Sequence, residues 1–321
     1  MRRSKSTLFA ATLGVLTLVS FAVAPAAARS ETSRVISYWT ADRIAHAIPR
    51  DFVRTPQGTF AASARRGKPG SGVVLGASWT KGGKILHASG KVVFTMGGTD
   101  FICSGSVVND ARTGNSMVLT AGHCAYDQSN NVFATNWMFI PEFDAVASYT
   151  CSRTKWGCWV ASGLVVDNGF ATAGGFNQQA TVNDFAIAIV GAGDRGTQLD
   201  TSVGSFGITY SGISSGDRLY AFGYPAAGKY FGFDLIYCAG PIFDDPVNSN
   251  LTWGIHCDMT GGASGGPWLS SFNEKTGVGI LSSLNSYGYG GINNIYGPKF
   301  DSDTQDVVNA ASTRTTNYIV P

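Results

Sequence analysis

The chain contains one glycine-rich octapeptide with a single serine, Gly261-Gly262-Ala263-Ser264-Gly265-Gly266-Pro267-Trp268. Its small residues leave the hydroxyl of Ser264 and the neighbouring backbone N–H groups accessible, which is how a nucleophile is presented. A serine hydroxyl is unreactive at neutral pH, so it needs a base for its proton and N–H donors for the oxyanion that forms. Because glycine and serine also gather in ordinary turns, the rest of the chain must supply these groups.

The candidate base is His123. Residues 117–124 run from an apolar strand into a turn that ends on this histidine, next to Cys124, so the imidazole would be held rigidly. Imidazole titrates near neutral pH and suits the uptake and return of one proton. A lone histidine is more often structural, but the histidines at positions 46, 87 and 256 have no comparable setting.

The candidate carboxylate is Asp184, which precedes the wholly apolar run 185–190. A carboxylate this close to a core needs a partner, and a histidine N–H would supply one. A plain aspartate in a turn before a strand is the alternative. The order His, Asp, Ser excludes the α/β hydrolases, which place the histidine after the serine. The subtilisin order would need Asp100 or Asp110, and neither opens an apolar strand.

The fold class follows from the spacing of short apolar runs rich in β-branched and aromatic residues. They lie at 91–96, 101–108, 117–120, 136–140, 185–190, 218–222 and 277–282, and Gly, Asn, Asp or Ser separates them. Without helical patterns between them, such runs predict an antiparallel all-β sandwich or barrel rather than a parallel α/β sheet. Only 305–311 is typical of a helix, and the Gly/Tyr-rich stretch 286–291 is expected to be a surface loop.

The first residues are typical of an exported protein. Basic residues precede an apolar run at 8–24, which is shorter than the roughly 20 residues of a membrane span, and Ala26 and Ala28 fit a cleavage site. We therefore expect residues 1–28 to be a signal peptide and the mature protein to be secreted, extracellular and free of the membrane. An uncleaved anchor is the alternative. Residues 29–84 are polar and interrupted, with a helix-like piece at 39–47, and we interpret them as a pro-segment. An extension kept in the mature protein is the alternative.

Charge gives little indication of a partner. Charged residues make up 14% of the 321 residues, against about 25% in typical soluble domains. The net charge of +2 forms no basic stripe, so we expect no nucleic-acid partner. We expect a monomer.

The six cysteines are expected to form disulfides, because an even number in an exported chain usually does. Six cysteines allow fifteen pairings. Neighbours in the sequence suggest Cys103 with Cys124, Cys151 with Cys158, and Cys238 with Cys257. The chain has no close Cys-x-x-Cys pair and its histidines are far apart, so we expect no metal site.

Taken together, three motifs resemble those of the chymotrypsin-like (trypsin-fold) serine peptidases. They are Thr120-Ala121-Gly122-His123-Cys124, Asp184-Phe185-Ala186 and Gly262-Ala263-Ser264-Gly265-Gly266-Pro267, in the order of the family. The strand that begins at Cys103 is similar to the one whose cysteine bridges to the cysteine after the histidine. The resemblance covers about residues 85 to 315. Gly223-Tyr224-Pro225 and Trp39-Thr40-Ala41 resemble secreted bacterial members of the glutamyl-endopeptidase-like (V8-like) branch.

The resemblance implies two antiparallel six-stranded β-barrels with a catalytic cleft between them at 85–321, closed by a short C-terminal helix. It implies a secreted serine endopeptidase that cuts polypeptides through an acyl-enzyme and needs no cofactor. Ser264 would be the nucleophile, His123 the base and Asp184 its orienting partner, while the N–H groups of Gly262 and Ser264 would bind the oxyanion. The strand containing Ser282 would pair with substrate backbone. A catalytically idle binding module and an esterase are the alternatives.

The residue preference before the scissile bond is less well defined. Asp258 lies six residues before Ser264, where trypsin-like enzymes carry the aspartate that pairs with Arg or Lys. Leu281 replaces the histidine by which typical glutamate-specific members recognise an acidic residue. Ala263 replaces the aspartate that receives the new N-terminus when trypsin-like zymogens are activated. We expect basic preference first, apolar second and acidic third.

Overall fold

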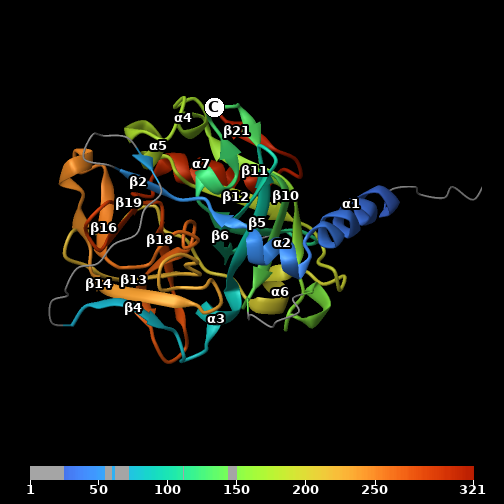
Figure 1. Ribbon diagram of the computed structural model, residues 1–321, viewed down its shortest axis with the longest axis horizontal. Helices are drawn as coiled ribbons and strands as arrows, with labels where there is room; N and C mark the ends of the chain where they lie inside the picture. Colours follow the sequence, from blue (N-terminus) through green and yellow to red (C-terminus); the bar gives the residue numbers. More distant parts are fainter. Residues whose placement is uncertain (1–24, 55–59, 62–71, 111, 144–149) are drawn as a thin grey trace, which may run out of the picture.

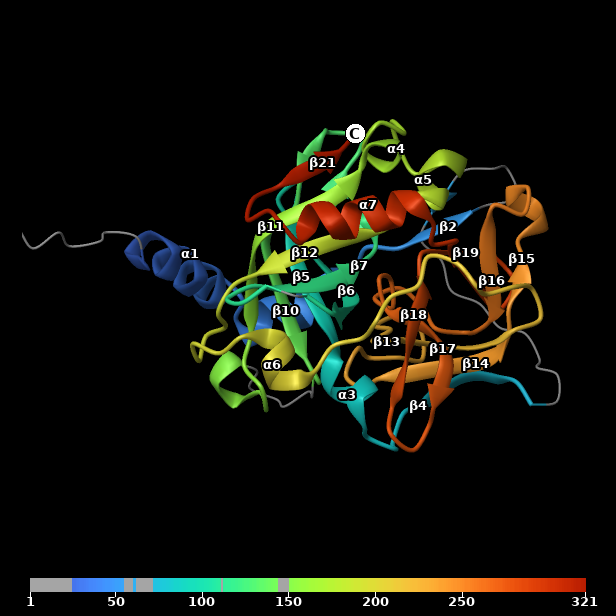
Figure 2. The same ribbon diagram turned by 180° about the vertical axis from the view of Figure 1, so that it is seen from behind.

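The computed structural model describes residues 25–54, 60–61, 72–110, 112–143 and 150–321. Most of the predicted signal peptide, residues 1–28, lies outside the described residues. The β-strands form two halves side by side, with helix α1 (Pro25–Tyr38) projecting from one of them (Figures 1 and 2). None of the helices in the described ranges is long and apolar enough to cross a membrane.

The first half is a closed barrel of six antiparallel strands. Its hydrogen-bonded order is β6-β5-β10-β11-β12-β7, and a further pairing of β6 with β7 closes it. All residues of β5, β7 and β12 are buried, because alternate side chains fill the barrel and neighbouring elements cover the outward-facing ones. The strands are β5 (Ser89–Met96), β6 (Thr99–Val108), β7 (Ser116–Thr120), β10 (Thr135–Pro141), β11 (Trp159–Asp167) and β12 (Ala186–Val190).

The second half consists of two packed sheets. One has the order β18-β17-β13-β14-β4, and the other has the order β15-β16-β20-β19-β2-β3. They meet where β14 lies beside β16 and β18 beside β20, around a core that includes Trp268, Ile255 and Leu219. The strands are β4 (Val74–Ser78), β13 (Arg218–Gly223), β14 (Ile236–Pro241), β15 (Phe243–Asp244), β16 (Thr252–His256), β17 (Pro267–Asn273), β18 (Val278–Leu284), β19 (Tyr287–Tyr289) and β20 (Asn294–Pro298).

The predicted all-β class with two barrel-like halves is therefore confirmed, although backbone hydrogen bonds close only the first barrel. The C-terminal helix is also confirmed: α7 (Ser302–Ala311) begins at a capping box on Asp301 and packs against β11 and β12. The final strand, β21 (Tyr318–Val320), pairs with β11 and was not predicted. The remaining short elements are α3 (Lys84–Ala88), β8 (Tyr126–Asp127), β9 (Val132–Phe133), α4 (Asn168–Ala171), α5 (Gln178–Val182) and α6 (Leu199–Val203).

The N-terminal segment packs on both halves. Helix α2 (Ala41–His46) falls within the helix-like piece expected at 39–47, and the indole of Trp39 before it donates to the carbonyl of Asn136 at 2.6 Å. Strands β1 (Ile48–Pro49), β2 (Phe52–Arg54) and β3 (Phe60–Ala61) follow. Strand β4 then pairs with β14, with Ser78 opposite Ile236. Regular strand structure of the second half thus begins inside the expected pro-segment 29–84, before Lys84.

The three disulfides join the cysteine pairs suggested by the sequence, namely Cys103 with Cys124, Cys151 with Cys158, and Cys238 with Cys257. The first bridge connects β6 to the turn after β7. It therefore lies directly beside the predicted catalytic histidine.

Candidate active site

His123 and Asp184 come from neighbouring strands of the first barrel. His123 lies in a short 3-10 turn (Gly122–Cys124) after β7, and Asp184 lies just before β12, which pairs with β7 so that Ala186 is opposite Thr120. The ring Nδ1 of His123 is 2.8 Å from Oδ2 of Asp184, and the backbone N–H of His123 donates to Oδ1 at 2.8 Å. Both side chains are fully buried. Since a carboxylate only accepts hydrogen bonds, Nδ1 carries the hydrogen.

Ser264 lies in the turn between β16 and β17, in the second half. The backbone N–H of Ser104 donates to the carbonyl of Ser264 at 2.7 Å, and the Ser104 hydroxyl donates to the carbonyl of Gly262 at 2.8 Å. A side chain could not be added at Gly265, which has φ +81°, because its Cβ would lie 2.3 Å from Oγ1 of Thr120. The glycines of the octapeptide thus allow the serine turn to pack against the first barrel.

The backbone around Ser264 is suited to binding an anion. Gly262 has φ +96°, a left-handed conformation that favours glycine. Within the described residues, the N–H groups of Gly262 and Ser264 have no acceptor, whereas that of Ala263 donates to the carbonyl of Thr260 at 3.3 Å. Two such donors beside a nucleophile can stabilise an oxyanion.

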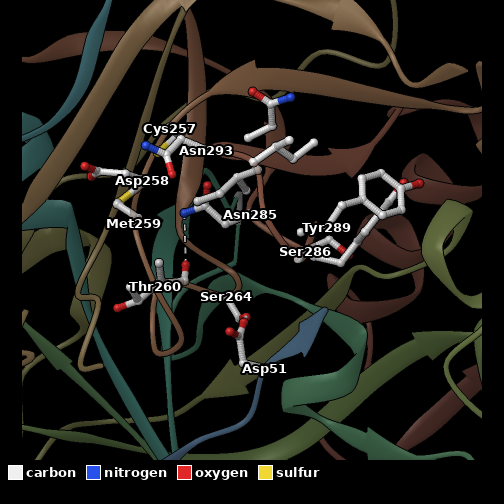
Figure 3. A pocket seen from close by; sticks show the side chains of 18 residues that line it. Asp51, Cys257, Asp258, Met259, Thr260, Ser264, Asn285, Ser286, Tyr289 and Asn293 are labelled. Carbon is white, nitrogen blue, oxygen red and sulfur yellow. Dashed lines mark hydrogen bonds between the residues drawn. The ribbon is translucent and has the colours of Figure 1, made fainter. Parts of the chain in front are cut away.

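The described residues contain no hydrogen bond between Ser264 and His123, because residues of the N-terminal segment lie at both groups. The Ser264 hydroxyl donates to Oδ1 of Asp51 at 3.4 Å, and the two side chains point toward each other (Figure 3). The ring Nε2 of His123 lies 3.0 Å from the carbonyl oxygen of Arg50. Burial raises the pKa of the Asp51 carboxyl to about 6, although His123 and the Ser264 hydrogen bond act in the opposite direction. Burial lowers the pKa of Arg50.

A pocket opens beside Ser264 and Asp51, and Asp258 lies at its far side (Figure 3). Other lining residues include Thr260, Asn285, Ser286, Gly288 and Ile292. Asp258 already has two partners: Oδ2 is 2.7 Å from Nζ of Lys229, and Oδ1 accepts a hydrogen bond from the Tyr230 hydroxyl at 2.6 Å. Burial, and then the hydrogen bond to Asp258, raise the pKa of Tyr230.

The structure does not bring Ser282 to this pocket. Its hydroxyl is buried in β18, donates to the carbonyl of Ile280 at 3.0 Å and lies 2.8 Å from Oγ of Ser270. Four residues later, Ser286 lines the pocket and donates to Oδ2 of Asp184 at 2.5 Å. Ser282 lies in the middle of β18 beside Ser270 of β17, and the chain reaches the pocket only after β18 ends at Leu284.

Several residues of the site were missed by the sequence analysis. The stretch 286–291 is not a surface loop, because Ser286 and Tyr287 are buried and β19 runs along the pocket. Asn285 also contributes: its amide donates to the carbonyl of Ala263 at 2.9 Å and so supports the serine turn. The run Asn285-Ser286-Tyr287-Gly288 follows an apolar strand, and this position in the sequence could have indicated that the run belongs to the site. Nothing in the sequence indicated Arg50, Asp51 or Phe52.

The ligand atoms of Cys103, His123 and Cys124 lie within 4.8 Å of one another, close enough to hold a metal ion. The two sulfurs are bonded to each other in a disulfide, however, and offer no thiolate. The two cysteines therefore act as a bridge beside the histidine.

Comparisons with known proteins agree with this geometry. A family model described as lysyl endopeptidase, C-terminal domain, matches residues 76–157, which begin in β4 and include His123. The search of curated proteins found no match.

Among solved structures, the protease Anisep from Arthrobacter nicotinovorans is 33% identical, with a TM-score of 0.63, over 75% of this chain and 100% of its own. The thermostable serine protease AL20 from an extremophilic microorganism is 35% identical, with a TM-score of 0.61, over 72% of this chain and 99% of its own. A Glu endopeptidase, at 20% identity and a TM-score of 0.53, shares the fold over 71% of this chain and 92% of its own.

Proposed function

We propose, because this chain belongs to the chymotrypsin-like serine proteases, that Ser264, His123 and Asp184 form its catalytic triad. The chain is a serine endopeptidase, and polypeptides are its substrates. The observation that carries the triad is the buried hydrogen bond between Asp184 and His123. It selects the tautomer whose Nε2 can take a proton from a serine. Two contacts of the Ser264 carbonyl support Ser264 as the nucleophile: it accepts the backbone N–H of Ser104 in β6 and lies 4.0 Å from Sγ of Cys124, the residue after His123.

The reaction follows from these positions once Arg50 and Asp51 leave. His123 Nε2 takes the proton of the Ser264 hydroxyl while Oγ bonds to the scissile carbonyl carbon. The negative oxygen of this tetrahedral intermediate is bound by the N–H groups of Gly262 and Ser264. His123 then returns the proton to the leaving amine as the C–N bond breaks and leaves an acyl-enzyme. Water attacks the acyl carbon by the same route, which releases the carboxylic acid and restores Ser264.

We also propose that the protein is exported and that residues 1–28 direct this export. Its three disulfides support the proposal, because such bonds form and persist in oxidising compartments outside the cytosol. Sequencing the N-terminus of protein recovered from the culture medium tests it. A cell-retained chain that still begins at Met1 would contradict it.

The triad is tested by Ser264→Ala, compared with Ser211→Ala as a control at an exposed serine outside the site. Peptide hydrolysis should fall by roughly 10⁶-fold in Ser264→Ala and leave a rate about 10³ to 10⁴ above the uncatalysed reaction. Ser211→Ala should match the wild type. Circular dichroism shows whether both variants are folded. Undiminished hydrolysis by folded Ser264→Ala would refute the assignment.

A further inference from the structure

Residues 48–54, here called the crossing segment, run through the proposed active site from the first barrel to the second half (Figure 1). At one end, Pro49 lies opposite Ile102 of β6, and the Arg50 N–H donates to the carbonyl of Ile102 at 3.3 Å. At the other end, Phe52 lies opposite Tyr287 of β19. The segment thus adds a short strand to each half and spans the two with Arg50 and Asp51.

The two spanning residues contact both reacting groups. The Arg50 carbonyl lies at Nε2 of His123, and the Arg50 guanidinium Nε donates to the His123 carbonyl at 2.7 Å. This carbonyl oxygen lies 3.0 Å from Nε2, the atom that would take the Ser264 proton, so it fills the position in which the serine hydroxyl would contact the base. The Asp51 carboxylate accepts the Ser264 hydroxyl and also lines the pocket beside it.

Aromatic packing holds the segment in this position. The Phe52 ring stacks on Phe176 with centroids 4.1 Å apart and meets the His123 ring edge-on at 5.2 Å. The Arg50 guanidinium lies 5.5 Å from the Phe101 ring centroid. The fit is close at Gly261, where an added Cβ would lie 2.7 Å from Cβ of Pro49.

We propose that the crossing segment is a built-in inhibitor of the protease. The Arg50 carbonyl blocks Nε2 of His123, and the Asp51 side chain blocks the Ser264 hydroxyl and the pocket beside it. This inference rests on the proposed function and adds its regulation. The group that faces Ser264 is a side-chain carboxylate rather than a peptide carbonyl. Because the carboxyl carbon of Asp51 carries no peptide C–N bond, the segment fills the site without presenting a bond to be cut there.

The inhibitor is tested in the full chain by the rate at which a fluorophosphonate probe labels Ser264. The comparison is between wild type, Asp51→Ala and the control Asp42→Ala, which removes an exposed carboxylate of α2 in the same N-terminal segment. Intact-mass measurement restricts the comparison to chains that still contain residues 48–54. We expect Asp51→Ala to be labelled at least about tenfold faster than wild type, because the segment has left the site in a larger fraction of the molecules. Asp42→Ala should match wild type.

A second variant, Phe52→Ala, loosens the segment without touching Ser264 and should also be labelled faster than wild type. It keeps the test decisive if Asp51→Ala does not fold. Equal labelling rates in wild type and the folded variants would overturn the proposal that the segment is an inhibitor and would leave the proposed function intact. If no chain were labelled, including Phe52→Ala, the proposed function itself would fail.

Discussion

Asp258 lines the pocket of this protease, yet it is already paired with Lys229. Among the described residues that line the pocket, the only charged ones are Asp51 and Asp258. Once Asp51 has left, the charge that remains is negative and favours a basic substrate side chain. Lys229 competes for that charge, but its side chain is 58% exposed, so a substrate cation can displace it at little cost.

We therefore expect substrate preference to depend on the balance between Asp258 and Lys229. We expect Lys229→Ala to raise kcat/KM for substrates with Arg or Lys before the scissile bond by up to about fivefold, because an exposed ion pair is worth up to about 1 kcal/mol. Asp258→Ser should remove the basic preference. A peptide library cut by wild type and both variants measures this. A basic preference that survives Asp258→Ser would show that Asp258 does not read the substrate.

At the scale of elements, the Cys103–Cys124 disulfide ties β6 to the turn that contains His123. The same two strands are already joined by backbone pairing, with Ser106 opposite Leu119. The bridge closes a loop with a sequence separation of 21 residues, whereas Cys151–Cys158 closes one of only 7. In the chain-entropy account, the longer loop contributes more stability.

Removing these bridges separately should show that difference. Replacing Cys103 and Cys124 by serine should lower the free energy of unfolding by about 3 kcal/mol, and replacing Cys151 and Cys158 by about 2 kcal/mol. Denaturant titration in the Ser264→Ala background, which prevents self-digestion, measures both. The chain-entropy account fails if removal of Cys151–Cys158 lowers the free energy of unfolding more than removal of Cys103–Cys124. In chains that keep Ser264, the rate at which the probe labels Ser264 after replacement of Cys103 and Cys124 then reports whether the first bridge also positions His123.

At the scale of the whole molecule, the crossing segment adds one short strand to each of the two halves, β1 to the first and β2 to the second. It covers Ser264 of one half and His123 of the other, so its departure exposes the complete site in one event. The titratable group that acts on Asp51 is His123, which is itself hydrogen-bonded to Asp184 and to the carbonyl of Arg50. Docking of the segment therefore depends on pH.

The direction in which docking changes with pH follows from the pKa of the Asp51 carboxyl. Its pKa is about 6 when docked, against an ordinary value of 3.8, so the docked state holds the proton more tightly. The docking equilibrium constant is largest below pH 3.8 and falls as the pH rises to about 6. The fall is at most about 100-fold, because each unit of difference in pKa corresponds to a tenfold change. A protonated His123 attracts the ionised carboxylate and reduces this effect.

The measurement is the ratio of fluorophosphonate labelling rates of full-length wild type and Asp51→Asn, from pH 5 to pH 7.5. The amide resembles the neutral acid and does not titrate, so the ratio cancels the pH dependence of the triad itself. We expect the ratio to rise with pH. A ratio that is flat or falls would contradict control by Asp51.

Much of the molecule could be predicted from local sequence. The short apolar runs predicted the all-β class, because strands that fill a barrel need β-branched and aromatic residues at close spacing. The cysteine pairs were correct because each pair lies close in the sequence. The candidate triad was recognisable because each member sits in a distinctive local context, such as the turn that ends on His123.

Tertiary structure alone decided which residues surround that triad. Ser286 rather than Ser282 meets Asp184, since the register of β18 and the end of that strand set which serine reaches the pocket. Asp258 could be recognised by its offset from Ser264, but its pairing with Lys229 depends on a loop that is distant in the sequence. The crossing segment has no sequence signature: Arg50 and Asp51 come to His123 and Ser264 only because β6 and β19 each accept an added strand. Local patterns determine strands and the chemistry of single residues, whereas long-range pairing determines which of these groups meet.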